Sequence, residues 1–185
     1  CMADNNSPTS FSRFIALLVF SLAVMTGLAA GVSVSFDQPS ITVMPGEVIT
    51  VNLTLDAAPA GISGFAIGIS VEDPSIGEIT DVTLPGWAEL SDTAGVPGPD
   101  VSIIAVDLQG TVEKDASGIL LATVSVKGLS SGTTEILLQE PLFDDDDGND
   151  LVPALSGVSL TVSANGAPPQ STTTITTNTT TSPPT

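Results

Sequence analysis

The residues best suited to chemistry in this sequence form an acidic run at positions 144–150. Clustered carboxylates and an amide oxygen suit Ca²⁺, which takes roughly six to eight oxygen ligands. The candidate ligands of a weak calcium site are Asp144, Asp145, Asp146, Asp147, Asn149 and Asp150. An EF-hand is excluded, because with Gly148 at the sixth loop position the first position would be Phe143. A solvated hairpin turn that bends at Gly148 and Asn149 is the alternative interpretation.

Trp87 is a second candidate, for contact with a ligand. It is the only Trp, it follows Pro85 and Gly86 in a loop, and the chain has no Tyr. Carbohydrate-binding sites stack sugar rings on several planar aromatic side chains, whereas Phe36 and Phe65 fall on apolar strand faces, where they are expected in the core. Trp87 is therefore either a lid over the core or a contact for a ligand or partner.

Few other residues suggest chemistry. Asn52 and Asn178 begin Asn-X-Thr sequons and are candidate glycosylation sites. Asp73, followed by Pro74, has no second carboxylate placed beside it by a motif, so it predicts a turn at a strand end. The chain has no His and one Cys, at position 1. The domain therefore lacks His, the usual general base, and both His and Cys, the usual ligands of zinc and copper. We expect no catalytic residue, no enzyme activity and no cofactor apart from weakly held calcium.

The charge is strongly one-sided. The chain has 3 Lys and Arg against 21 Asp and Glu, for a formal net charge of −18. A nucleic-acid partner is excluded, since nothing here would neutralise a run of phosphates. Dense surface carboxylates are common in extracellular and halophilic proteins, where they hold water and cations.

Residues 1–30 predict a secretory signal peptide. Arg13 precedes a largely apolar stretch from Phe14 that ends in small side chains, with cleavage expected near Ala29 or Ala30. The alternative is an uncleaved anchor, because the stretch is only slightly shorter than the ~20 residues that span a bilayer. Either interpretation predicts a secreted or cell-surface protein, with membrane contact only through that leader or a missing C-terminal anchor.

Residues 31–163 predict an all-β domain, since apolar residues recur with period two and no segment has an apolar period of 3.6. Turn formers separate the runs, as at Met44–Glu47 and Gly95–Pro99. The pattern favours an antiparallel sandwich of eight or nine strands with a core large enough to need no disulfide. The expected strands lie at 32–36, 49–55, 65–71, 79–84, 101–108, 119–127, 134–138 and 158–162.

Residues 164–185 are rich in Thr and Pro. Such a tract has almost no apolar surface to bury, so it predicts an extended, disordered linker or an O-glycosylated stalk. Because the sequence stops inside this tract, we expect further modules or an anchor beyond it.

Three segments carry a resemblance to a known family. Residues 44–55 have a Gly turn followed by a valine-rich strand, residues 65–82 have a strand that ends in Asp-Pro and then a second strand, and residues 118–138 form a late hairpin. In this order they resemble a cohesin-type module, of the β-sandwich superfamily shared with cellulose-binding modules. One departure is Val71-Glu72 before Asp-Pro, where the family often has Tyr or Phe.

The resemblance implies a nine-stranded jelly roll and a non-catalytic role. A cohesin docks a calcium-loaded dockerin on another protein, in polysaccharide-degrading or cell-surface assemblies. The resemblance assigns no individual binding residues, because partner contacts vary within the family. Two alternatives stay open: a carbohydrate-binding module of the same superfamily that takes a polysaccharide, and a structural repeat of a cell-envelope or adhesin protein.

Overall fold

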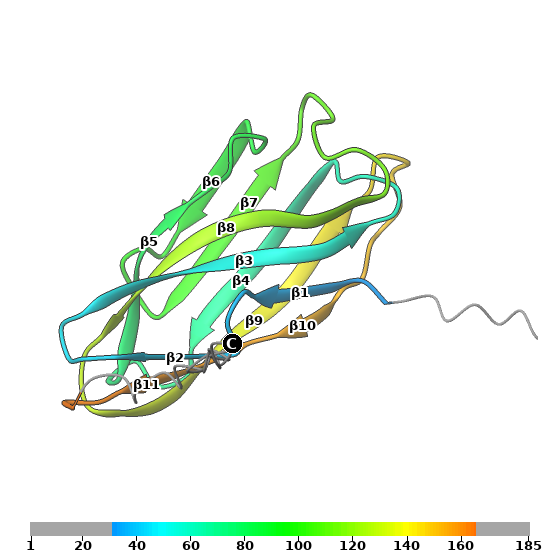
Figure 1. Cartoon of the computed structure of the whole chain (residues 1–185). Coiled ribbons are helices and arrows are strands. Elements are labelled where there is room, and N and C mark those ends of the chain that lie inside the picture. Colours follow the sequence, from blue (N-terminus) through cyan, green and yellow to red (C-terminus); the bar gives the residue numbers. More distant parts are fainter. Residues whose placement is uncertain (1–30, 166–185) are drawn as a thin grey trace, which may run out of the picture. The chain divides into compact units, whose positions relative to one another are not determined.

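The computed structural model describes residues 31–165, and these contain eleven β-strands and no helix (Figure 1). Accordingly, no helix in that range is long and apolar enough to cross a membrane. The predicted signal peptide and most of the predicted linker lie outside the described residues. The strands are β1 Ser33–Phe36, β2 Ser40–Val43, β3 Val48–Ala58, β4 Gly64–Val71, β5 Gly77–Thr83, β6 Leu90–Ala94, β7 Asp100–Val106, β8 Ala116–Gly128, β9 Gly132–Asp144, β10 Ala154–Ser156 and β11 Val158–Val162.

The strands form two sheets that pack face to face, which confirms the predicted all-β sandwich (Figure 1). The five-stranded sheet has the order β10-β1-β3-β8-β5, and the six-stranded sheet has the order β2-β11-β9-β4-β7-β6. Most pairs are antiparallel, as predicted, but β1 with β10 and β2 with β11 are parallel. Those two pairs bring the N-terminal and C-terminal strands of the domain together in both sheets.

The difference between eleven strands and the predicted nine arises where the chain changes sheets. β1 and β10 belong to the five-stranded sheet, whereas their continuations β2 and β11 belong to the six-stranded sheet. Counting each broken run once gives nine segments. The second change occurs at Gly157, where an added Cβ would lie 2.4 Å from the Ile136 carbonyl oxygen. Only a residue without a side chain fits this approach of two backbones.

The inward-facing residues alternate along the strands as predicted and form one core between the sheets. Val51, Leu53 and Leu55 of β3 are at most 1% exposed. In β4, Phe65, Ile67, Ile69 and Val71 are at most 4% exposed. Burial of these aliphatic side chains supplies the main stabilising term of a fold whose described residues contain no cysteine.

A bulge in β9 changes which side chains face the core. Two residues, Glu140 and Pro141, lie opposite the single residue Ile67 of β4. In an uninterrupted strand Leu138 and Phe143, five residues apart, would face opposite sides. The extra residue turns both inward, so Phe143 is 1% exposed and its ring stacks on Phe65 at 5.3 Å between centroids.

Candidate functional site

The acidic run begins at Asp144, the last residue of β9, and continues as a tight turn, and its side chains do not converge. One carboxylate oxygen of Asp145 accepts hydrogen bonds from the backbone N–H groups of Asp147 at 3.0 Å and Asn149 at 2.8 Å, and the Asn149 amide donates to both of its oxygens. The Asn149 backbone N–H is the main cause of a lowered pKa at Asp145. Within residues 31–165 no three His, Cys, Asp or Glu side chains are arranged to hold a metal ion. Calcium binding by residues 144–150 stays a prediction that this arrangement does not support.

Trp87 lies over the core between the sheets. Its indole Nε1–H donates to the Leu120 carbonyl oxygen of β8 at 2.9 Å. Its ring lies 6.0 Å from Phe65 between centroids, at an interplanar angle of 53°. This geometry fits the lid better than the ligand contact, because the polar edge of the ring is already occupied.

The remaining candidates have local partners. The Asn52 side chain donates to Asp37 at 3.0 Å and accepts from the Thr123 hydroxyl at 3.0 Å. Asp73 accepts from the hydroxyl and the backbone N–H of Ser75, and these bonds lower its pKa and fix a turn after β4. Asn178 lies outside the described residues, so glycosylation at either sequon stays a prediction.

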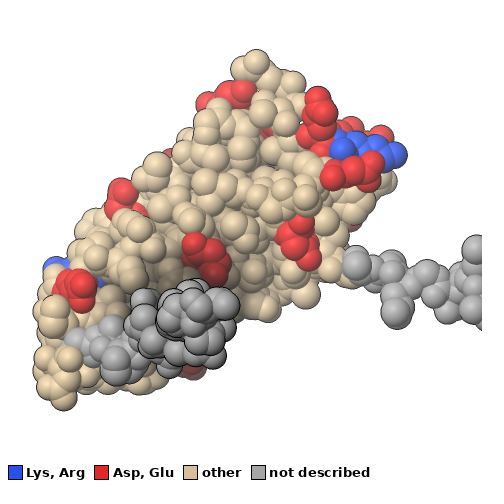
Figure 2. Space-filling model, viewed as in Figure 1, with Lys and Arg blue, Asp and Glu red and all other residues tan. Residues whose placement is uncertain are grey.

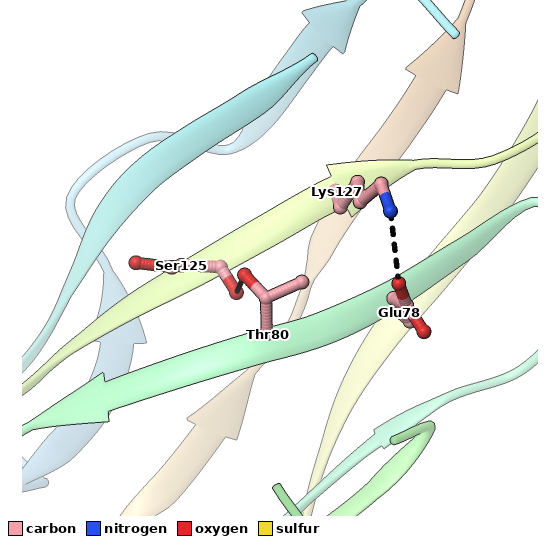
Figure 3. A network of polar contacts seen from close by, with 4 residues as sticks. All are labelled: Glu78, Thr80, Ser125 and Lys127. Atoms are coloured by element: carbon pink, nitrogen blue, oxygen red, sulfur yellow. Dashed lines mark hydrogen bonds and ion pairs between the residues drawn. The ribbon is translucent and has the colours of Figure 1, made fainter. Parts of the chain in front are cut away.

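The outer face of the five-stranded sheet is polar. Thr50, Asn52 and Thr54 alternate with the buried residues of β3, and Thr80 of β5 donates to the Ser125 carbonyl oxygen of β8 at 3.3 Å. Lys127 and Glu78, 3.5 Å apart, form the one ion pair among residues 31–165 (Figure 3). In the view of Figure 2 the surface is mostly uncharged, with acidic side chains scattered over it.

The outer face of the six-stranded sheet is different, because it exposes large aliphatic side chains. Of the eight large hydrophobic side chains exposed in the described chain, four lie on its strands β6, β7 and β9, and all four are aliphatic. The four are Leu90 (61% exposed), Ile104 (49%), Leu137 (37%) and Leu142 (55%). The register places all four on the side away from the core, Leu142 because of the β9 bulge.

Between these aliphatic residues, β4 turns only small residues outward. They are Gly64, Ala66, Gly68 and Ser70, and they alternate with Phe65, Ile67, Ile69 and Val71, which face the core. Because the outward side chains of β4 are small, two open grooves lie along this strand, with volumes of about 350 Å³ and about 130 Å³. The larger is lined by residues that include Ser70, Asp100, Ser102 and Gln139. The smaller is lined by residues that include Ala66, Ile104, Val106, Leu142 and Asp144.

We name the outward residues of β9, β4, β7 and β6 the small-residue face. Of the predicted site residues only Asp144, the last residue of β9, lies on it, and no short motif marks it. A signal was nevertheless present, since Ile104 lies between the inward residues Ile103 and Ala105, at a position where the alternation calls for a polar residue. Leu142 carried no such signal, because its direction depends on the bulge.

The comparisons with known proteins agree with this architecture. No family model matches the sequence, and no curated protein matches it. Among solved structures, a non-cellulosomal cohesin from the archaeon Archaeoglobus fulgidus has 19% identity and a TM-score of 0.60, over 74% of this chain and 94% of that one. The sixth cohesin of Acetivibrio cellulolyticus scaffoldin B, solved in complex with the Cel5 dockerin, has 16% identity and a TM-score of 0.60, over 72% and 99%.

A third similar structure is a type I cohesin–dockerin complex, Coh-OlpA-Doc918, from Clostridium thermocellum. It has 15% identity and a TM-score of 0.60, over 72% of this chain and 99% of that one. Together these likenesses define the class: the described domain is a β-sandwich with the cohesin fold. The resemblance carried by residues 44–55, 65–82 and 118–138 is confirmed at the level of the fold.

Proposed function

We propose that this protein is a non-catalytic docking module that binds a dockerin-type protein partner through its small-residue face. The observation that carries the proposal is the gathering of four exposed aliphatic side chains on one face of one sheet. Exposed apolar side chains gathered on one face of a protein are typical of protein-interaction sites. The five-stranded sheet carries one such side chain, Val48, at the first residue of β3.

The construction of the face supports docking without rearrangement. All four strands are paired within one sheet, so the aliphatic residues are held in fixed positions before a partner arrives. A preformed face loses little conformational entropy on binding. The small residues of β4 allow a partner backbone or side chain to approach the sheet closely between Ile104 and Leu142. These features suit a rigid docking surface better than an enclosed ligand site.

The choice of a dockerin-type partner rests on the similar structures. The Acetivibrio cellulolyticus cohesin was solved with the Cel5 dockerin, and the Clostridium thermocellum cohesin with Doc918. The leader predicted at residues 1–30 and the Thr/Pro tract at 164–185 suggest a secreted or cell-surface setting. In that setting the module would assemble surface proteins or polysaccharide-degrading enzymes.

The test is calorimetric titration of the full chain with a panel of calcium-loaded dockerin modules, including the Cel5 dockerin and Doc918. Ile104→Asp should abolish binding, because it places a desolvated carboxylate in the middle of the interface. Val48→Asp is the matched control, since Val48 is 50% exposed and Ile104 is 49% exposed, both on strands. The proposal fails if no dockerin binds, or if both variants reduce binding equally. Retention on insoluble cellulose that Trp87→Ala removes would instead favour a carbohydrate-binding module.

A further inference from the structure

We infer that the docking partner presents a basic side chain and an aliphatic side chain, about 13 Å apart, to two separate grooves of the small-residue face. The inference rests on the proposed function and adds the chemistry of the partner surface. It follows from the charges around the face, from the different linings of the two grooves and from their spacing along β4.

The charges on the outer side of the six-stranded sheet are all negative among the described residues. The register turns four carboxylates outward, on β6, β7 and β9. They are Asp92 opposite Ile104, Asp100 opposite Ser70, Glu135 opposite Ser159, and Asp144 opposite Gly64. Neither described lysine lies on this sheet, since Lys127 belongs to β8 and Lys114 to the loop between β7 and β8. A partner with carboxylates at these positions would be repelled, and one with basic side chains would be attracted.

The two grooves differ in what they offer. The larger groove has the Asp100 carboxylate, the Ser70 and Ser102 hydroxyls and the Gln139 amide around its lining. A Lys or Arg side chain fits this lining, because its apolar stem can lie over Gly68 while its charged end meets the carboxylate and neutral acceptors. The smaller groove has three outward aliphatic side chains, Ile104, Val106 and Leu142, beside the Asp144 carboxylate, whereas the larger groove has no large aliphatic side chain facing outward, so the smaller groove is the one that takes an aliphatic side chain.

The spacing of the grooves follows from β4. On β4 the larger groove is lined by residues 68–70 and the smaller by residues 64–66, so corresponding lining residues lie four apart. At about 3.3 Å per strand residue this separation is about 13 Å. The face therefore selects a partner by a pair of side chains of different chemistry at a defined distance, which a uniformly basic or uniformly apolar surface does not supply.

The experiment is a selection from a displayed Doc918 library whose surface helix positions are randomised, with the full chain as bait. Enriched clones should carry Lys or Arg together with an aliphatic residue at a Cβ separation near 13 Å. An enriched clone then serves as the probe for three neutralised sites, Asp92→Asn, Asp100→Asn and Asp144→Asn, combined in one variant. This variant should lower the association rate constant about tenfold at low salt, and the loss should disappear at high salt.

The control removes the same charge elsewhere, as Glu47→Gln, Asp81→Asn and Asp115→Asn combined, at three exposed positions. It should change the rate less than about twofold, because remote charges act only through the screened long-range field. Equal losses in both variants, or enriched clones without basic residues, overturn the inference while leaving docking intact. No enrichment, or clones insensitive to Ile104→Asp, would instead refute the proposed function.

Discussion

Leu142 and Phe143 are neighbours in sequence, and the β9 bulge determines which of the two side chains faces the core. Phe143 is 1% exposed and stacks on Phe65, whereas Leu142 is 55% exposed on the small-residue face. We predict that Phe143→Ala reduces stability and that Leu142→Ala reduces partner affinity. Replacement of a buried Phe by Ala costs about 3–5 kcal/mol, which should lower the melting temperature by about 10 °C or more.

For Leu142 the affinity effect follows from its exposed fraction. Full burial of a Leu side chain stabilises by about 2–3 kcal/mol, so covering the exposed 55% contributes about 1–1.5 kcal/mol. Leu142→Ala should therefore weaken dockerin binding about tenfold. Its effect on the free energy of unfolding should stay within about 0.5 kcal/mol, as at other surface positions.

The assay is urea unfolding followed by Trp87 fluorescence, combined with calorimetric titration of each variant. Phe143→Leu is included as a milder core change, in case Phe143→Ala fails to fold. The reasoning is refuted if Leu142→Ala is the destabilising variant and the Phe143 variants are not. That outcome would mean that the strand continues without the bulge and turns Leu142 into the core.

Three further predictions concern stability. Trp87→Phe should lower the free energy of unfolding by about 1 kcal/mol, because the Leu120 carbonyl loses its hydrogen-bond donor. Unchanged stability together with lost retention on cellulose would contradict the interpretation of Trp87 as a lid over the core. Burial opposes ionisation of Asp107, but hydrogen bonds from backbone N–H groups, led by that of Val112, outweigh burial and lower the pKa of this carboxyl. The ionised Asp107 therefore stabilises the fold at pH values above its unfolded pKa of about 3.9, and this contribution is lost as the pH falls through the folded pKa. In acid-unfolding curves the stability gap between wild type and Asp107→Asn should narrow below that range, and a constant gap would contradict the assignment. Residues 31–165 contain twenty carboxylates and only two lysines, so the carboxylates repel one another. Sodium chloride up to about 0.5 M should screen this repulsion and raise the melting temperature, whereas a falling melting temperature would contradict it.

Much of the fold was predictable because burial on one side of a strand leaves a period-two record. The alternation of Phe65, Ile67, Ile69 and Val71 is visible in the sequence, and the structure buries all four. The short strands were harder. β6 has no buried apolar residue, so its strand pairing with β7 leaves no hydrophobic pattern to detect.

The candidate site was largely beyond the sequence, for a physical reason. The predicted site residues were chosen for chemical reactivity or ligand donation, and the structure gives Asp145, Asn52 and Trp87 local partners. A docking face instead depends on which unreactive residues point outward together. That depends on strand order and on the bulge at Glu140 and Pro141, both of which arise from long-range pairing between β4 and β9.

The most direct test of docking is an NMR footprint of the full chain with and without the calcium-loaded dockerin that binds it best. Backbone amide shifts should change in β4, β7 and β9 around Ala66, Ile104 and Leu142, and should stay unchanged across Thr50, Asn52 and Thr123 of the five-stranded sheet. Changes gathered on the five-stranded sheet, with the small-residue face unaffected, would contradict the assigned face and with it the whole account of binding.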